Sequence, residues 1–152
     1  MDASDLQAQT RKAHAFKALH ERAQVFVIPN PWDAGSAKML ASLGYQALAT
    51  TSAGYAFSQG KADGALSLEE TLANVRAIVA ATDLPVAVDL ENGFSDDPAE
   101  SAKSLLRAAE AGAVGGSIED ATGRPDVPIY CFEHAVARIE AAVAAVRTLP
   151  FP

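Results

Sequence analysis

The chain has 152 residues, enough for one domain with a sizeable core, since 49% of the residues are apolar and only 20% are charged. Twelve Lys and Arg against nineteen Asp and Glu give a formal charge of −7, which argues against a nucleic-acid partner. No apolar run is as long as a membrane span, and no signal-peptide pattern opens the chain, so we expect a cytoplasmic protein without a membrane partner. The single cysteine, Cys131, excludes an internal disulfide and is expected to be a small buried residue.

Short apolar runs alternate with longer helical patterns along the chain. An N-terminal helix is expected near residues 6–22, within a first segment 1–24. Four strands follow in the pattern, and the segment 50–66 is expected to be a loop; the strands are at 25–28, 46–49, 85–89 and 114–118. Helices are expected between and after the strands, at 34–43, 67–81, 98–111 and 133–147. Their starts carry N-cap signals: Asp33, the capping box Ser67–Glu70, and Asp97 followed by a proline.

This alternation predicts an α/β fold whose parallel strands are covered by helices. An open doubly wound sheet and part of a (β/α)₈ barrel are both compatible with it. A complete barrel takes about 250 residues, and this chain supplies four βα units. The end, residues 149–152, resembles the approach to a further strand. We therefore predict a TIM-barrel type fold in which residues 25–152 form only the first four βα units and stop before strand five.

Acidic residues lie at the carboxyl ends of two predicted strands, where ligands bind in parallel α/β folds. Asp89 and Glu91 share one face of an extended strand, and Glu119 ends the neighbouring strand. Carboxylates that converge repel each other unless a cation or a proton neutralises them, and oxygen ligands favour Mg²⁺. The alternative is that these residues cap helices or lie in solvent. For Asp33 and Asp97 we favour capping.

Other strand ends carry weaker signals. The hydroxyls and small residues of 51–54 let backbone N–H groups approach an anion, although ordinary loops have the same composition. Trp32 follows the first strand and either forms a pocket wall or packs beside two prolines. The histidines lie on predicted helices, and we do not expect them to be catalytic.

The strand-end motifs together resemble one known family. These motifs are Asn30-Pro31-Trp32-Asp33, Thr51-Ser52, the segment 88–94 and Ser117-Ile118-Glu119-Asp120. In order and spacing they resemble the isocitrate lyase / phosphoenolpyruvate mutase superfamily over about residues 25–147. The resemblance implies a (β/α)₈ barrel that uses Mg²⁺, or Mn²⁺ in its place, to hold a 2-oxo acid or enolate while a C–C or P–C bond breaks or forms.

The resemblance also implies roles for individual residues. Asp89, Glu91 and Glu119 match metal-binding or metal-orienting acids, and Glu91 and Glu119 are also catalytic candidates together with Asp63, which matches an acid lining the site. The segment Thr51, Ser52 and Ala53 matches the one that holds the substrate carboxylate or enolate oxygen. Trp32 and Asn92 complete the substrate-binding candidates.

The departures from the family pattern limit the substrate assignment. Glu91, Asn92 and Ser95 stand where many relatives have Asp, another residue and Gly, and the Lys-x-Cys-Gly loop of the lyases has no counterpart at 121–126. An isocitrate or methylisocitrate lyase is therefore disfavoured, and a relative acting on another 2-oxo or 2-hydroxy acid or a phosphonate is favoured.

The main alternative is a catalytically incomplete half-barrel or assembly subunit. A phosphoacceptor receiver domain is disfavoured because paired acids after strand one are missing. Open strand edges predict a homo-oligomer.

Overall fold

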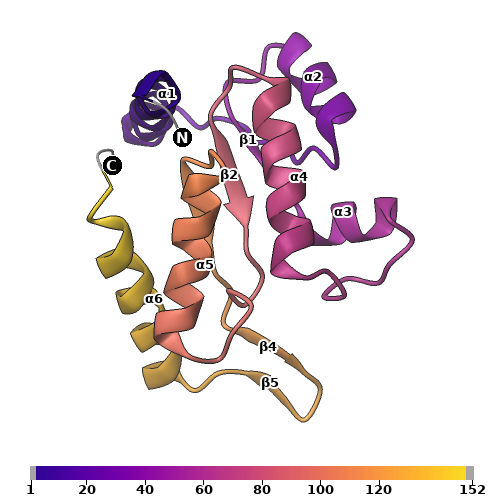
Figure 1. Ribbon diagram of the computed structural model, residues 1–152, viewed down its shortest axis with the longest axis vertical. Helices are drawn as coiled ribbons and strands as arrows, with labels where there is room; N and C mark the ends of the chain where they lie inside the picture. Colours follow the sequence, from indigo (N-terminus) through magenta and orange to yellow (C-terminus); the bar gives the residue numbers. More distant parts are fainter. Residues whose placement is uncertain (1–2, 150–152) are drawn as a thin grey trace.

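The computed structural model of the chain describes residues 3–149, so residues 150–152 of the predicted approach to strand five lie outside the described part. Helices and strands follow one another in the order expected for an α/β fold (Figure 1). The helices are α1 Ala3–Glu21, α2 Ala34–Ser42, α3 Ser52–Ser58, α4 Leu68–Ala81, α5 Pro98–Glu110 and α6 Phe132–Val146. The strands are β1 Leu48–Ala49, β2 Val86–Asp89, β3 Gly115–Ser117, β4 Ala121–Arg124 and β5 Val127–Ile129.

The central sheet is parallel, in the order β1-β2-β3, with Ala49 beside Ala87 and Ala87 beside Gly115. Successive side chains along a strand point to opposite faces, so each strand contributes to two different surfaces. On one face, Leu48, Val86 and Val88 are buried against α2, α4 and α5 and form the core. The other face carries small residues, which leaves room for the candidate site.

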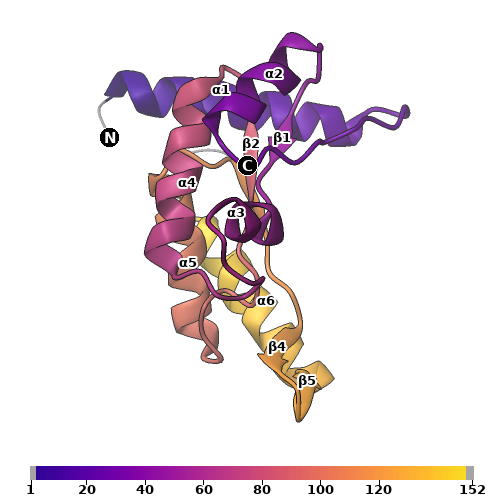
Figure 2. The ribbon, with the colours of Figure 1, turned by 90° about the vertical axis from the view of Figure 1, so that its right-hand side faces the viewer.

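Local hydrogen bonds set the starts of three helices where the sequence predicts them. Asp33 accepts from Ser36 N–H at α2, Ser67 and Glu70 form the capping box of α4, and Asp97 accepts from two N–H groups at α5. Helix α1 crosses the sheet at the amino ends of the strands, opposite the carboxyl ends (Figure 2). It is fixed there by Gln9, whose Nε2 donates to the carbonyls of Ala109 and Ala113 at 2.7 and 2.8 Å.

Two expectations about the fold are wrong. Residues 25–28 form no strand: Val25 is 99% exposed and Val27 65%, and one backbone bond, from Ala49 N–H to Pro29, joins the following residues to the sheet. A strand needs a ladder partner, and apolar composition alone does not provide one. Within the predicted loop 50–66, residues 52–58 form α3.

Two further differences concern the region after β3. An antiparallel hairpin, β4–β5, follows Asp120, where the sequence pattern showed no strand. Cys131, expected to be buried, is exposed; it precedes α6 as its N-cap residue, and its side chain makes no capping hydrogen bond. Within residues 3–149, no helix is long and apolar enough to cross a membrane.

Candidate functional site

The predicted carboxylates lie at the carboxyl ends of β2 and β3. Asp89 is the last residue of β2, Glu91 follows two residues later, and Glu119 lies two residues beyond β3. Because β2 and β3 pair in parallel, with Asp89 beside Ser117, their ends meet at one edge of the sheet. The two segments are also joined directly, since Glu119 N–H donates to the Glu91 carbonyl at 2.7 Å.

Asp89 is held by three donors from its own strand end and from α3. Its Oδ2 accepts from the Ser52 N–H at 3.0 Å and from the Ser52 hydroxyl at 2.9 Å, and its Oδ1 accepts from the Glu91 N–H at 3.1 Å. This explains why residues 52–58 are helical: Thr51 caps the first turn by accepting from Gly54 N–H, and Asp89 takes up the Ser52 donors. Asp89 is thus fixed in orientation before any ligand binds.

Glu91 lies in an unusual environment for a carboxylate. Its Oε1 is buried and has no hydrogen-bond partner, and its backbone is in the left-handed region, with φ 48°. Burial first, and then the negative charges of Asp63, Asp89 and Glu119, together raise its pKa to about 7. The pKa of Glu119 is raised for the same reasons, first by burial and then by Asp89 and Asp63. The four predicted acids therefore form one electrostatic cluster.

A cavity of about 450 Å³ opens on the small-residue face of the sheet. Of the predicted site residues, Thr51, Asp89 and Glu119 line it. Its other lining residues are Phe16, His20, Asn30, Ala49, Thr50, Ala87, Val88, Gly116 and Ser117. Ser117 belongs to a strand-end motif that the sequence shows, although it is not among the predicted site residues. His20 could not have been found from the sequence, because only the packing of α1 over the sheet brings it there.

The remaining predicted residues lie outside the walls of this cavity. Trp32 is half exposed and lies against α3, where a Cβ at Gly54 would come within 2.6 Å of its ring. The side chain of Asn92 is engaged on both sides, accepting from Phe94 N–H and donating to the Tyr130 hydroxyl at 3.3 Å. Asp63 Oδ1 accepts from Gly64 N–H in the loop before α4.

Comparison with known proteins identifies the family. The sequence model of the family described as phosphoenolpyruvate phosphomutase matches residues 16–152. The chain belongs to this family. It is 33% identical to 2-methylisocitrate lyase of Escherichia coli K12 over 139 residues, which is 86% of this chain and 47% of the relative. It therefore spans less than half the length of that curated relative.

Solved structures agree with this family. A candidate lyase or mutase of Burkholderia cenocepacia J2315 is 59% identical, with a TM-score of 0.94 over 95% of this chain and 52% of that one. The structure of oxaloacetate acetylhydrolase is 26% identical, with a TM-score of 0.81 over 91% of this chain and 49% of that one. The predicted isocitrate lyase / phosphoenolpyruvate mutase superfamily is thus confirmed. The α/β fold is confirmed as well, whereas the barrel of the prediction is not established by the three parallel strands described.

The donor set can be compared with what Mg²⁺ requires. Among residues 3–149, no three His, Cys, Asp or Glu side chains are grouped closely enough to bind a metal ion by themselves, and this includes the predicted trio Asp89, Glu91 and Glu119. Mg²⁺ in proteins usually takes only one or two carboxylates and completes its shell with waters and substrate oxygens. A buried carboxylate oxygen without a partner, Glu91 Oε1, among three further acids fits such a cation.

Proposed function

We propose that this chain is the N-terminal half of a Mg²⁺-dependent (β/α)₈ enzyme that breaks or forms a C–C or P–C bond in a 2-oxo or 2-hydroxy acid through an enolate-like intermediate. The observation that carries the proposal is the cluster of Asp63, Asp89, Glu91 and Glu119, in which Glu91 has a buried oxygen without a donor and a pKa near 7. Membership of the phosphoenolpyruvate phosphomutase family supports the reaction class. The relatives named for 2-methylisocitrate and oxaloacetate support the substrate class.

Asp89 and Glu119 are the proposed Mg²⁺ ligands. Glu91 would support these two side chains or the waters that the cation keeps. The cation would offset negative charge that develops on an enolate oxygen. Ser52 N–H and hydroxyl keep Asp89 Oδ2 in one orientation, so Asp89 needs little rearrangement on binding. Thr51 and Ala53 at the start of α3 are the proposed contacts of the substrate carboxylate, with Trp32 and Asn92 at the border of the site. Both donors of Ser52 are engaged by Asp89, so the proposed role of Ser52 toward the substrate runs through Asp89.

Glu91 is the proposed proton carrier. A general acid or base works best when its pKa lies near the working pH, and the pKa of Glu91 is raised to about 7 by burial and by the neighbouring acids. Asp63 and Glu119 act on Glu91 through their charges, which is the role we propose for Asp63 in the reaction.

The alternative function is a half-site without activity of its own. It is favoured by the length of the chain, which covers 47% of E. coli 2-methylisocitrate lyase and 52% of the most similar structure described above. We expect the 152-residue chain alone to show little turnover of oxaloacetate, methylisocitrate or phosphonopyruvate. Robust turnover by this chain would contradict the proposal that it is half of a site.

Calorimetric titration with Mg²⁺ and Mn²⁺, with and without oxalate, tests the metal site in the chain as given. We expect Asp89→Ala and Glu119→Ala each to weaken binding by about tenfold or more, since each removes a proposed ligand. Asp97→Asn is the matched control, because it removes one negative charge from the same acidic segment while an amide can still cap α5. Binding by both alanine variants at the affinity of the parent chain would show that these carboxylates do not hold the metal.

A further inference from the structure

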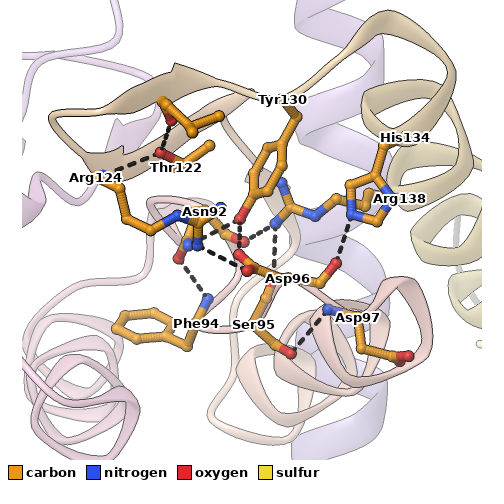
Figure 3. A network of polar contacts seen from close by, with 11 residues as sticks. Asn92, Phe94, Ser95, Asp96, Asp97, Thr122, Arg124, Tyr130, His134 and Arg138 are labelled. Atoms are coloured by element: carbon orange, nitrogen blue, oxygen red, sulfur yellow. Dashed lines mark hydrogen bonds and ion pairs between the residues drawn. The ribbon is translucent and has the colours of Figure 1, made fainter.

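Arg138 is a buried cation that contacts the segments following β2 and β3, next to the candidate site. It comes from α6 and is only 1% exposed. Figure 3 shows its guanidinium pointing between the loop after β2 and the ring of Tyr130. Its Nη2 donates to the Asn92 carbonyl, to the Ser95 carbonyl at 3.1 Å and to Ser101 Oγ at 3.4 Å, and its Nη1 donates to the Glu119 carbonyl at 3.3 Å.

The charge of Arg138 is not matched by an ion pair within residues 3–149. Carbonyl oxygens and the Tyr130 ring, whose centroid lies 4.2 Å from the guanidinium carbon, stabilise it together with the nearby negative charge of Asp96. Burying a cation is costly unless its donors are satisfied; the Nε of Arg138 is buried without a partner, so the contacts of Nη1 and Nη2 with the carbonyls carry the compensation. Arginine suits the role, because its planar fork offers several donors in fixed directions and a lysine ammonium does not.

The carbonyls that Arg138 binds belong to the segments that carry Glu91 and Glu119. Residues 91–95, which we call the site turn, have unusual backbone geometry: Glu91 and Phe94 have φ of 48° and 61°, and Gly93 has φ of 72°. Left-handed non-glycine residues are strained and persist only where the surroundings hold them. Ser104 holds the turn at the Gly93 carbonyl at 2.8 Å, and Arg138 holds it at both Asn92 and Ser95.

We propose that Arg138 is a positioning residue of the carboxylate site: by binding the carbonyls of Asn92, Ser95 and Glu119 together, it keeps Glu91 and Glu119 in place relative to Asp89. This inference rests on the proposed function, because positioning Glu91 and Glu119 matters only if the carboxylate site is used. The contacts of Arg138 themselves do not depend on a metal. Arg138 acts through the backbone and touches no reacting group. Without it, three carbonyls lose a donor, and only weaker support, such as the bond from Ser104 to the Gly93 carbonyl, would hold the site turn in the left-handed conformation.

The experiment compares the parent chain with Arg138→Met, Arg138→Lys and Ile78→Val. Ile78 is fully buried in a second core cluster, with Ala37, Leu48 and Val86, that contains no residue of the site turn, so Ile78→Val lowers stability away from the site. The first readout is the backbone conformation of Glu91 and Phe94, from NMR coupling constants and carbon shifts at a temperature where every variant is folded. The second is the affinity for Mn²⁺, from calorimetry.

We expect Arg138→Met to lose the left-handed signature at Glu91 and Phe94 and to bind Mn²⁺ about tenfold more weakly, as changes around metal ligands do. Arg138→Lys should retain part of both, and Ile78→Val should retain both in full. Parent-like values for Arg138→Met in both measurements would overturn the proposal and leave Arg138 a purely structural residue. If Arg138→Met does not fold, the same two measurements on Arg138→Lys decide: a partial loss supports the proposal, and parent-like values in both overturn it. If the parent chain binds no Mn²⁺, the proposed function fails, while the NMR readout still decides the role of Arg138.

Discussion

Glu91 ties the stability of the protein to pH. Burial and three neighbouring acids raise its pKa to about 7, against 4.5 for an ordinary glutamate, so the folded chain binds its proton more tightly than the unfolded chain does. Between these pH values the folded state holds more protons, and the free energy of unfolding must fall as pH rises. Glu119, whose pKa is also raised, acts in the same direction.

We therefore expect the metal-free chain to lose on the order of 1–2 kcal/mol between pH 5 and 8, less than the full pKa difference implies, because the side chain is partly exposed. Glu91→Gln should show a much smaller loss, and Glu100→Gln on the exposed surface of α5 should behave like the parent chain. Urea unfolding at a series of pH values measures the effect. A parent chain whose stability rises over this range would contradict the assigned environment of Glu91.

Gly93 is required in the site turn for two separate reasons. Its φ of 72° is costly for any residue with a Cβ, and a Cβ there would lie 2.1 Å from Ser101 Oγ. Gly60 provides a matched control, since its φ is 69° and a Cβ there would meet no atom within 4 Å. We expect Gly60→Ala to lower the free energy of unfolding by about 1 kcal/mol and Gly93→Ala by about 3 kcal/mol. Equal losses for the two variants would show that the contact with Ser101 is relaxed without cost.

Helix α5 shows how an element connects to the site, because it begins directly after the site turn. Asp97 Oδ1 accepts from the N–H groups of Ala99 and Glu100 at 2.9 and 3.0 Å, and Pro98 occupies the first turn. We expect Asp97→Ala to cost about 1 kcal/mol, because two N–H groups at the helix start lose their acceptor. Asp97→Asn should cost much less, since an amide oxygen can also cap. Chemical denaturation of both variants measures the difference, and equal costs would mean that charge, not capping, is what Asp97 contributes.

Capping signals explain which elements could be predicted from the sequence. The starts of α4 and α5 are predicted to within one residue, because the hydrogen bonds of Ser67, Glu70 and Asp97 involve only neighbours in the chain. Helix α3 was missed, since its first turn depends on Asp89 from another strand. The strand expected at 25–28 fails for the same kind of reason: a ladder depends on a partner that the local pattern does not specify.

At the scale of the whole molecule, the site is a product of the parallel order of β1, β2 and β3. The positions of Asp89 and Glu119 at one edge could be predicted, because parallel strands bring their carboxyl ends together. The environment of Glu91 could not, since its burial and its approach to Asp63 depend on how the loop before α4 lies over the sheet. Arg138 was also missed: on the sequence it is one charged residue in a helix, and only the packing of α6 shows that it is buried.

The same arrangement predicts how the isolated 152-residue chain behaves in solution. Among the strands described, β1 and β3 each pair only with β2, and one hydrogen bond to Pro29 covers part of the β1 edge. On α6, apolar side chains at helical spacing are exposed, among them Phe132 at 76% and Ile139 at 45%. Unpaired strand edges and exposed apolar area both favour association with a second copy.

We expect light scattering at low micromolar concentration to show a mass that rises with concentration above the 15.8 kDa of one chain. Ile139→Lys should reduce this association, because it places a charge in the exposed apolar stripe of α6. Met39→Lys on α2, where the methionine is 68% exposed, is the control and should leave association unchanged. A monomer of 15.8 kDa at every concentration would mean that these edges and this stripe do not bring two copies together, and the expected homo-oligomer would then be wrong for this chain.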